Sequence, residues 1–408
     1  MPNLSQLINK IENRLTRRKR NRAWLSFSYI FRQLAGNLSF FYLPLFLFSK
    51  AQELGWWGWE LNSIQKGMIL ITAFYLTERL VSAILSMIQA AFSIKMGHDW
   101  SMIVGTLAYT LFLVSFSRVD QSPLWLIVGA FLAGVQLVFY WPPYNTLLAK
   151  LSFKKNMGKN LGRFGFISNF ASMISPAAGG LIIAFFGYNY LFYCSIVFLL
   201  VSLIGLFKLD LGEERDEVNF KEYFEWMKEK SFVKLTTSQS GRYFYDMSVT
   251  LWPLYVFLLL GDVEKVGYVY SISLLLAMII NLFIGGVLDK KKNSSKPFVF
   301  SGGFLSTLSV LRLAVVGVWG VVIVDACSRV VGNFHWLFND LILYRRGKGS
   351  QEFSYFVYYA FNRAVAAVMF WALLLIFFFL VPVEWTGLFV MGGVGVLLSL
   401  LIQEKWGQ

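Results

Sequence analysis

The sequence predicts an all-α polytopic membrane protein of twelve transmembrane helices, arranged as two pseudo-symmetric bundles of six. Three observations lead to this fold class. Of the 408 residues, 57% are hydrophobic and only 15% are charged, whereas soluble domains carry about 25% charged residues. Twelve segments come close to the roughly 20 apolar residues that a bilayer core requires. The two halves of the chain also carry similar residues in the same order. This composition excludes an ordinary soluble domain and an intrinsically disordered chain.

The first half begins with a basic segment and continues with six apolar segments. Residues 1–22 contain the run Arg17-Arg18-Lys19-Arg20 and apolar residues at helical spacing. We expect them to form an amphipathic helix in the plane of the cytoplasmic leaflet, bound to anionic lipids. Residues 23–209 are expected to form the N-terminal bundle. Its spans lie near 24–48, 67–94, 100–117, 123–149, 161–186 and 189–208.

One long polar connection, residues 210–237, divides the chain in two and holds eight acidic residues. We expect it to be a solvated tether with a short helix near residues 220–230, and docking of a partner protein is the alternative interpretation. Residues 238–408 then form the C-terminal bundle. Its spans lie near 239–260, 264–288, 297–316, 317–343, 352–381 and 384–403, and only Gly317 and Gly320 separate the ninth span from the tenth.

The basic residues of the connections predict the orientation of the chain. Outside the central connection, 21 Lys and Arg fall on one side of the expected membrane, and only Lys50, Lys66, Arg118 and Lys265 fall on the other. Because cytoplasmic loops are enriched in Lys and Arg, we expect both termini in the cytoplasm and the protein in a plasma or inner membrane. The same rule explains the N-terminal arginines, so the sequence gives no support for nucleic-acid binding.

The two halves repeat several polar and helix-breaking residues. Each half has an early Arg and a late Pro in its first span, and an aromatic residue followed five positions later by Asn in its fourth. The matched residues are Arg32 and Pro44 with Arg242 and Pro253, and Tyr140, Trp141 and Asn145 with Phe334, His335 and Asn339. In transporters built from repeated halves, the binding site lies where the halves meet.

The chain resembles the major facilitator superfamily from about residue 24 to residue 403. The family's loop signature is recognisable as Gly285-Gly286-Val287-Leu288-Asp289-Lys290, and it is degenerate after the second span, where Ile94 stands at the acidic position. The fifth span resembles the family's antiporter motif through its small residues, and tight helix packing is the alternative interpretation. These residues are Gly162, Ala171, Ser175, Pro176, Gly179 and Gly180.

The resemblance implies a monomeric transporter that works by alternating access, with spans 1, 4, 7 and 10 around a central solute site. The drug-antiporter branch of the family carries an Arg in the fourth span. Here Gln136 is the strongly polar residue before Tyr140, which disfavours drug–proton antiport.

Six arginines and four acids lie within the expected spans. They are Arg32, Arg79, Arg242, Arg312, Arg329, Arg363, Glu78, Asp246, Asp325 and Asp340. A charge at the bilayer centre costs about 2.5–3.5 kcal/mol on insertion scales, so such residues face the bundle interior and find partners. Asp325, Arg329 and Asn333 share one face of the tenth span. Either Arg329 holds an anionic solute group and Asp325 takes up a proton, or the two form a structural ion pair.

Other polar residues within the spans are weaker candidates. Those that we expect near the solute are Gln33, Asn37, Gln136, Tyr140, Tyr359, Asn362 and Arg363. Tyr355, Tyr359 and Asn362 share one helical face, which either lines a cavity or packs. Glu78 is the alternative site of proton coupling.

The remaining candidates are expected to act in gating or packing. They are Pro142, Pro143, Pro176, Gly179, Gly180, Asp289, Arg32 and Arg242. Pro142 and Pro143 remove backbone donors from the fourth span. We expect Arg242 to form a local salt bridge with Asp246, four residues away, and Asp340 to interact with a loop.

These observations predict secondary active transport of a small polar or anionic solute, coupled to an ion or proton gradient. The excess of arginines over acids within the spans motivates the anionic solute. Proton-coupled efflux of amphipathic compounds, or lipid flipping, is the alternative, which the aromatic-rich spans favour. We expect no cofactor, no metal and no enzymatic activity, because the chain has only two histidines and two cysteines, too few for a metal centre built on them, and no recognisable catalytic motif.

Overall fold

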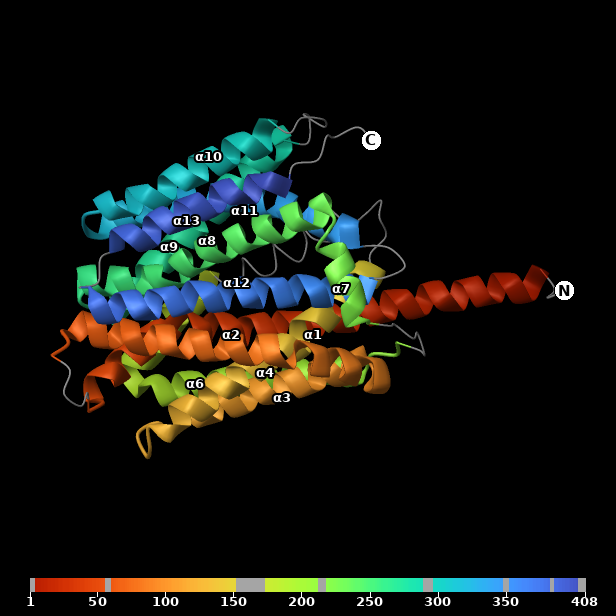
Figure 1. Cartoon of the computed structure of the whole chain (residues 1–408), viewed down its shortest axis with the longest axis horizontal. Helices are drawn as coiled ribbons and strands as arrows, with labels where there is room; N and C mark the ends of the chain where they lie inside the picture. The colour runs from red at the N-terminus through yellow and green to blue at the C-terminus, as the bar shows by residue number, and fades with distance from the viewer. Residues whose placement is uncertain are drawn as a thin grey trace.

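The computed structural model describes residues 4–55, 60–151, 173–211, 218–288, 296–347, 352–381 and 385–402. Within these ranges long helices lie side by side in an elongated bundle (Figure 1). The helices of the first half are α1 (Leu4–Glu53), α2 (Ser63–Met96), α3 (His98–Phe116), α4 (Leu124–Leu151), the unlabelled helix Met173–Phe186, and α6 (Tyr188–Phe207).

The short helix α7 (Phe220–Trp226) belongs to the central connection and precedes the second half. The second half consists of α8 (Lys230–Leu260), α9 (Val263–Leu288), α10 (Lys296–Leu311), α11 (Gly317–Gly347), α12 (Glu352–Leu380) and α13 (Trp385–Ser399). Single 3₁₀ turns, Arg312–Ala314 and Leu400–Ile402, extend α10 and α13.

Ten of the described helices are long and apolar enough to cross a membrane. The other two expected spans are the 24–48 part of α1 and the segment 161–186, of which the structure describes Met173–Phe186. The 24–48 part of α1 is less apolar because Arg32, Gln33 and Asn37 interrupt it. Ten spans thus agree with the expected architecture, and the full count of twelve stays a prediction.

The break between the ninth and tenth spans lies where the sequence placed it. Gly317 has a φ of 67°, a left-handed backbone conformation that glycine adopts without steric penalty. It separates the 3₁₀ turn Arg312–Ala314 from α11. A single glycine is therefore enough to end one span and start the next.

The N-terminal segment differs from the separate in-plane helix that we expected. Residues Leu4–Glu53 form one helix of 50 residues, whose first part projects from the bundle (Figure 1). No Gly or Pro lies between residues 3 and 35 to break it. The helix is also fixed where it enters the bundle, because Arg17 and Arg20 contact the carboxylate of Asp210 at 2.6 and 2.8 Å, and the Asn21 amide donates to the Asp210 carbonyl oxygen at 2.6 Å.

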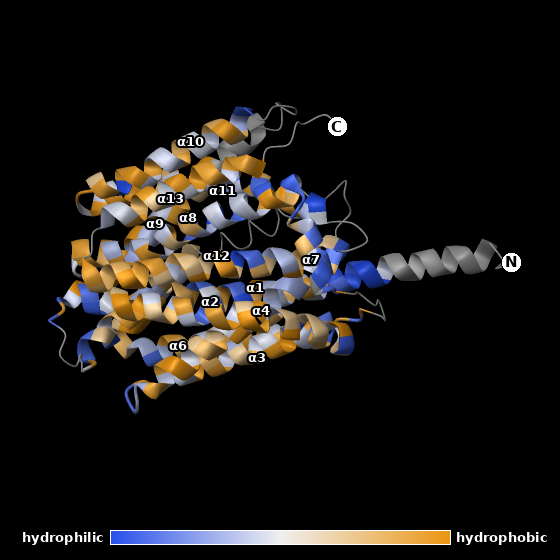
Figure 2. Cartoon of the chain, viewed as in Figure 1, coloured by the Kyte–Doolittle hydropathy of each residue, from blue (hydrophilic) through white to orange (hydrophobic). Residues whose placement is uncertain are grey.

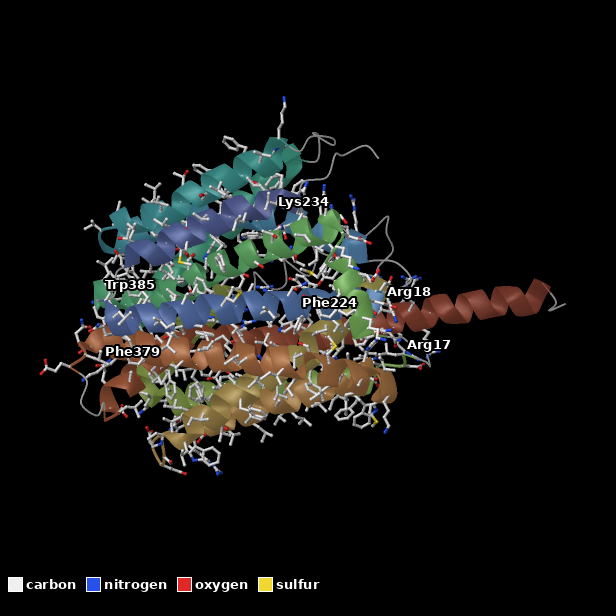
Figure 3. The ribbon with its side chains drawn as sticks, viewed as in Figure 1. Arg17, Arg18, Phe224, Lys234, Phe379 and Trp385 are labelled. Atoms are coloured by element: carbon white, nitrogen blue, oxygen red, sulfur yellow. The ribbon has the colours of Figure 1, made fainter. Side chains whose placement is uncertain are left out.

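Both termini lie at the same end of the bundle (Figure 1), which we call the terminal end; the other is the distal end. Arg17, Arg18 and Lys234 lie toward the terminal end, whereas Phe379 and Trp385 lie at the distal end (Figure 3). Figure 2 shows hydrophilic residues concentrated at the terminal end, around α7 and the base of the projecting helix. Hydrophilic residues also lie at the distal end (Figure 2).

The two halves pack closely where the helix Met173–Phe186 meets α9. A Cβ atom on Gly267 would lie 2.5 Å from the carbonyl oxygen of Pro176, and one on Gly180 would lie 3.3 Å from the carbonyl oxygen of Val263. The Ala177 N–H donates to the hydroxyl of Ser271 at 3.0 Å. These backbone approaches support the packing interpretation of the small residues in the fifth span, while Gly162 and Ala171 lie outside the described residues.

Candidate functional site

A network of alternating charges joins α8, α11 and α12 inside the second half, and we call it the central network. Arg242 forms an ion pair with Asp340, and its Nε lies 4.0 Å from Asp246. Asp246 also accepts a hydrogen bond of 2.7 Å from Arg363, which in turn donates to the hydroxyl of Tyr359 at 3.3 Å. Two arginines and two carboxylates thus neutralise one another within the bundle.

The central network differs from one of our expectations and adds to another. Asp340 contacts the half-buried Arg242 and not a loop, because α11 continues to Gly347 and places Asp340 within the helix. The expected local pair of Arg242 and Asp246 is the longest contact of the group, and Asp246 lies closer to Arg363. Both contacts join residues about 100 positions apart, which helical spacing alone does not indicate.

Tyr243 of α8 connects this network to the first half. The guanidinium carbon of Arg79, on α2, lies 4.9 Å from the centre of the Tyr243 ring, and that of Arg363 lies 5.7 Å from it. The indole of Trp371 donates to the Tyr243 hydroxyl at 2.5 Å, and Tyr75 of α2 stacks on Trp371 at 5.0 Å. Cationic and aromatic side chains therefore meet at the interface between the halves.

Glu78 and Arg79 form a buried pair on α2. Their closest charged atoms are 3.3 Å apart, and the Glu78 side chain is 2% exposed. Neither of these two atoms makes a hydrogen bond in the described part of the chain, in keeping with the angle of about 100° between adjacent residues of a helix. The Glu78 Oε2 atom thus contacts Arg79 through charge and without a hydrogen bond.

Asp325 and Arg329 form the expected pair on α11. The Arg329 Nε donates to Asp325 at 2.6 Å, and the Asp325 side chain is 2% exposed. The guanidinium of Arg329 also lies 5.4 Å from the ring centre of Tyr270 on α9. Asn333 continues the same face of α11 and is half-buried. The structure brings Asp325 and Arg329 together on one face of α11, as their spacing predicted.

Arg32 of α1 occupies a different kind of site, formed by neutral partners. Its guanidinium donates to the Gln136 side chain and, at 3.3 Å, to the Thr106 hydroxyl. The Tyr140 ring lies 3.6 Å from its central carbon, and the Tyr109 ring lies 5.1 Å away. The sequence analysis expected Gln136 and Tyr140 near the solute and Arg32 in gating or packing, whereas the structure places Arg32 in contact with both.

Thr106 and Tyr109 are the members of this Arg32 site that the sequence analysis missed. Both lie on α3, one turn of helix apart, at positions where a hydroxyl in an apolar span gives no distinctive signal. The Thr106 hydroxyl also donates to the carbonyl oxygen of Met102, one turn earlier in α3. The Tyr109 hydroxyl shares a hydrogen bond of 2.7 Å with the Ser39 hydroxyl. Only the packing of α3 against α1 and α4 selects them.

The three residues that share one face of α12, Tyr355, Tyr359 and Asn362, contact different parts of the structure. Asn362 accepts a hydrogen bond of 2.7 Å from Tyr223 of α7, and Tyr355 donates to the Leu343 carbonyl oxygen at 3.2 Å. Burial against α12 raises the pKa of the Tyr223 phenol. Of the three residues on this face, only Tyr359 reaches the central network, so Tyr355 and Asn362 pack against neighbouring segments.

The remaining candidates lie on separate elements. Gln33 and Asn37 are half-buried on α1, and Pro142 and Pro143 are buried within α4, which continues through them. Pro176, Gly179 and Gly180 lie on the helix Met173–Phe186. Asp289 lies outside the described residues.

The contacts among the described residues show which of the six intramembrane arginines lack a nearby carboxylate. Each of the four intramembrane acids lies within 4.0 Å of at least one arginine: Glu78 of Arg79, Asp325 of Arg329, Asp340 of Arg242, and Asp246 of Arg363. In the described part of the chain, Arg32 and Arg312 have no carboxylate at this distance. Arg312 lies instead near Ser248 and the ring of Trp252. The two uncompensated arginines are therefore in different halves.

Membrane-length helices in two packed halves, with buried charges collected where the halves meet, define the class of helical solute transporters. The family model of the Major Facilitator Superfamily matches residues 25–369. The chain therefore belongs to this superfamily, whose members are membrane transporters of small-molecule solutes, and the resemblance seen in the sequence is confirmed. No curated protein matches the chain.

Proposed function

We propose that the protein is a secondary active transporter that moves a small polar or anionic solute by alternating access, coupled to an ion or proton gradient. The observation that carries this proposal is the cluster around Tyr243, where Arg79 of the first half and Arg363 of the second approach the same ring. A transporter made of two halves binds its solute at their interface. Residues there lose or gain contacts when the halves move.

Contacts between the halves near both ends support an occluded arrangement. Toward the terminal end, the Tyr344 hydroxyl of α11 donates to the Asn145 side chain of α4 at 2.6 Å. Toward the distal end, Phe41 of α1 packs edge-on against Tyr270 of α9, with ring centres 4.8 Å apart. In alternating access one of these contacts breaks while the other persists.

The proposal includes an orientation and an environment. The terminal end, which carries the basic connections, lies in the cytoplasm together with both termini. The protein is a monomer in the plasma or inner membrane, where its solute and the surrounding lipids are its partners. It has no enzymatic activity.

Asp325 and Arg329 provide the test of this function. In proteoliposomes, we expect uptake of the solute to depend on a pH or ion gradient, and both Asp325→Asn and Arg329→Gln to reduce it at least about tenfold, because each leaves a buried charge without its partner. The exposed Arg118 provides the matched control, Arg118→Gln, which should retain wild-type uptake. Loss of uptake in Asp325→Asn alone would indicate proton coupling without anion capture by Arg329.

The solute is identified by thermal stabilisation of the purified protein against a library of solutes across pH, since a ligand that binds the folded state raises its melting temperature. The same screen applied to Glu78→Gln tests the second proton site, where stabilisation should lose its pH dependence. Absence of transport and of stabilisation by every solute would contradict the proposal.

Proton-coupled efflux of an amphipathic compound is the second candidate function. The stacked pair of Tyr75 and Trp371 beside Tyr243 favours it, because aromatic surfaces at the interface between the halves suit apolar compounds. Transport of a hydrophobic cationic dye, driven by a pH gradient alone, would distinguish this efflux function from transport of a polar or anionic solute. Insensitivity of dye transport to the pH gradient would exclude it.

A further inference from the structure

We propose that Arg32 is the binding residue for a singly charged organic anion of the monocarboxylate class, in a site formed by α1, α3 and α4. This inference rests on the proposed function, because the anion is taken to be the transported solute. It moves the anion site from Arg329, where the sequence placed it, to Arg32, one of the two arginines without a carboxylate within 4.0 Å among the described residues.

The first observation behind this proposal is that no carboxylate of the described residues lies within 4.0 Å of the Arg32 side chain. The Arg32 side chain is buried, with 4% of the residue exposed, yet its hydrogen-bond acceptors are the neutral side chains of Gln136 and Thr106. A buried cation without a counter-ion is expensive, because neutral acceptors only partly replace the lost hydration. An anion supplied from outside would remove this cost.

The second step is the comparison with the matched arginine of the other half. Arg242 occupies the position that corresponds to Arg32 in the repeat, and it contacts both Asp340 and Asp246. The same arginine position is therefore neutralised by the protein in the second half and left uncompensated in the first. The absence of a carboxylate around the more deeply buried Arg32 is consistent with a site for a carboxylate supplied by the solute.

The third step is the surplus of hydrogen-bond donors around Arg32. Ser28 lies one helical turn before Arg32, and its hydroxyl lies beside that of Tyr140. Both residues are fully buried, and apart from their contact with each other neither hydroxyl has a hydrogen-bond partner among the described residues. A carboxylate, which only accepts hydrogen bonds, suits such a set of donors.

The charge and shape of the site select a monoanion. One uncompensated positive charge matches one negative charge, whereas a doubly charged phosphate or sulfate would leave a buried negative charge without a partner. The planar guanidinium also binds a carboxylate through two parallel hydrogen bonds. The rings of Tyr109 and Tyr140, whose centres lie 5.1 and 3.6 Å from the Arg32 guanidinium carbon, favour a small apolar body on the anion.

Access to Arg32 requires Tyr140 to move, and the sequence of α4 provides for this. Pro142 and Pro143 follow Tyr140, and neither can donate a backbone hydrogen bond to the preceding turn. The carbonyl oxygen of Phe139, which Pro143 leaves without its helical partner, accepts instead from the Ser101 hydroxyl at 2.8 Å. The backbone around Tyr140 is therefore held by a side chain of α3, which a movement of α4 can release.

Two variants test the inference by opposite routes. Arg32→Gln removes the cation, and Gln136→Glu supplies an internal carboxylate to it. We measure thermal stabilisation of the full-length protein in detergent by acetate, lactate and benzoate, with phosphate, sulfate and chloride at matched ionic strength. At least one monocarboxylate should stabilise the wild type saturably, and both variants should weaken its apparent Kd about tenfold or more.

Controls separate binding from folding. Gln136→Glu should melt at or above the wild-type temperature without ligand, since it pairs a buried charge, so its loss of binding is not a loss of fold. Arg118→Gln should bind as the wild type. The inference is overturned if no monocarboxylate stabilises the wild type, if phosphate binds more tightly than all three, or if Gln136→Glu binds with unchanged affinity.

Uptake measurements in proteoliposomes keep the two proposals distinguishable. If the protein transports a solute but monocarboxylates neither compete with it nor are carried, the Arg32 inference fails while the proposed function stands. If monocarboxylates bind saturably but neither they nor any other solute crosses the membrane, the proposed function fails while the anion site remains.

Discussion

At the scale of single residues, the buried charges of this protein differ in whether the chain supplies their partner. Arg242 has two carboxylates within 4.0 Å and Arg329 has one at 2.6 Å, whereas Arg32 contacts neutral groups and aromatic rings. A paired arginine stabilises the packing of its helices, but an arginine without a carboxylate is free to bind an anion. The groups that contact a buried charge therefore indicate its role better than the depth of that charge in the membrane does.

The pair of Arg242 and Asp340 gives a prediction about stability. Asp340→Asn should lower the stability of the protein by about 2 kcal/mol, less than the roughly 3–5 kcal/mol of a fully buried pair, because both side chains keep some exposure. The melting temperature and a double-mutant cycle with Arg242→Gln measure it, and the double variant should lose less than the sum of the single losses.

The control for this cycle is an exposed pair on the surface. Glu225 lies 3.3 Å from Lys228, and both side chains are more than 70% exposed. Glu225→Gln should change stability by less than about 0.5 kcal/mol, because solvent screens such a pair. Equal effects of the two substitutions would mean that the central network contributes nothing beyond a surface ion pair.

At the scale of helices, the contact between Met173–Phe186 and α9 fixes how closely the halves approach. Gly267→Ala places a methyl group 2.5 Å from the backbone oxygen of Pro176, which cannot move without shifting its helix. We expect a lower melting temperature and slower uptake. Gly303→Ala is the matched control, since no atom lies within 4 Å of the added methyl group, and alanine favours a helix over glycine. A Gly267→Ala protein with normal uptake would show that this contact is not rigid.

The sequence predicts the helices better than it predicts the pairs between them. Apolar length places ten spans, and Gly317 alone places a break that the structure contains. The pairing of Arg242 with Asp340 is not predictable in this way, because it depends on which faces of α8 and α11 meet after packing. The contact of Asn362 with Tyr223 likewise required knowing where α7 packs. Local spacing indicated the Asp325–Arg329 pair correctly because both residues lie on one helix.

At the scale of the whole molecule, the two halves contact each other near both ends, with the charged residues between. Cross-linking the terminal end should therefore stop transport. In a variant without Cys194 and Cys327, we expect Asn145→Cys with Tyr344→Cys to lose uptake after treatment with a short thiol cross-linker that a reducing agent can cleave, because the two side chains are in contact. Reduction should restore uptake, and either single cysteine should be insensitive to the reagent. Uptake that persists after complete cross-linking would contradict alternating access at this end.

The anchoring of the central connection limits how far the terminal end can open. Asp210 is bound to α1 of the first half through Arg17, Arg20 and Asn21, and the Asn219 carbonyl oxygen accepts from Tyr358 of α12 in the second half. Only residues 211–219 join these anchors, and a chain of this length spans at most about 30 Å when extended. Under the proposed alternating access, this connection would keep the anchors at Asp210 and Asn219 within about 30 Å of each other while the halves move.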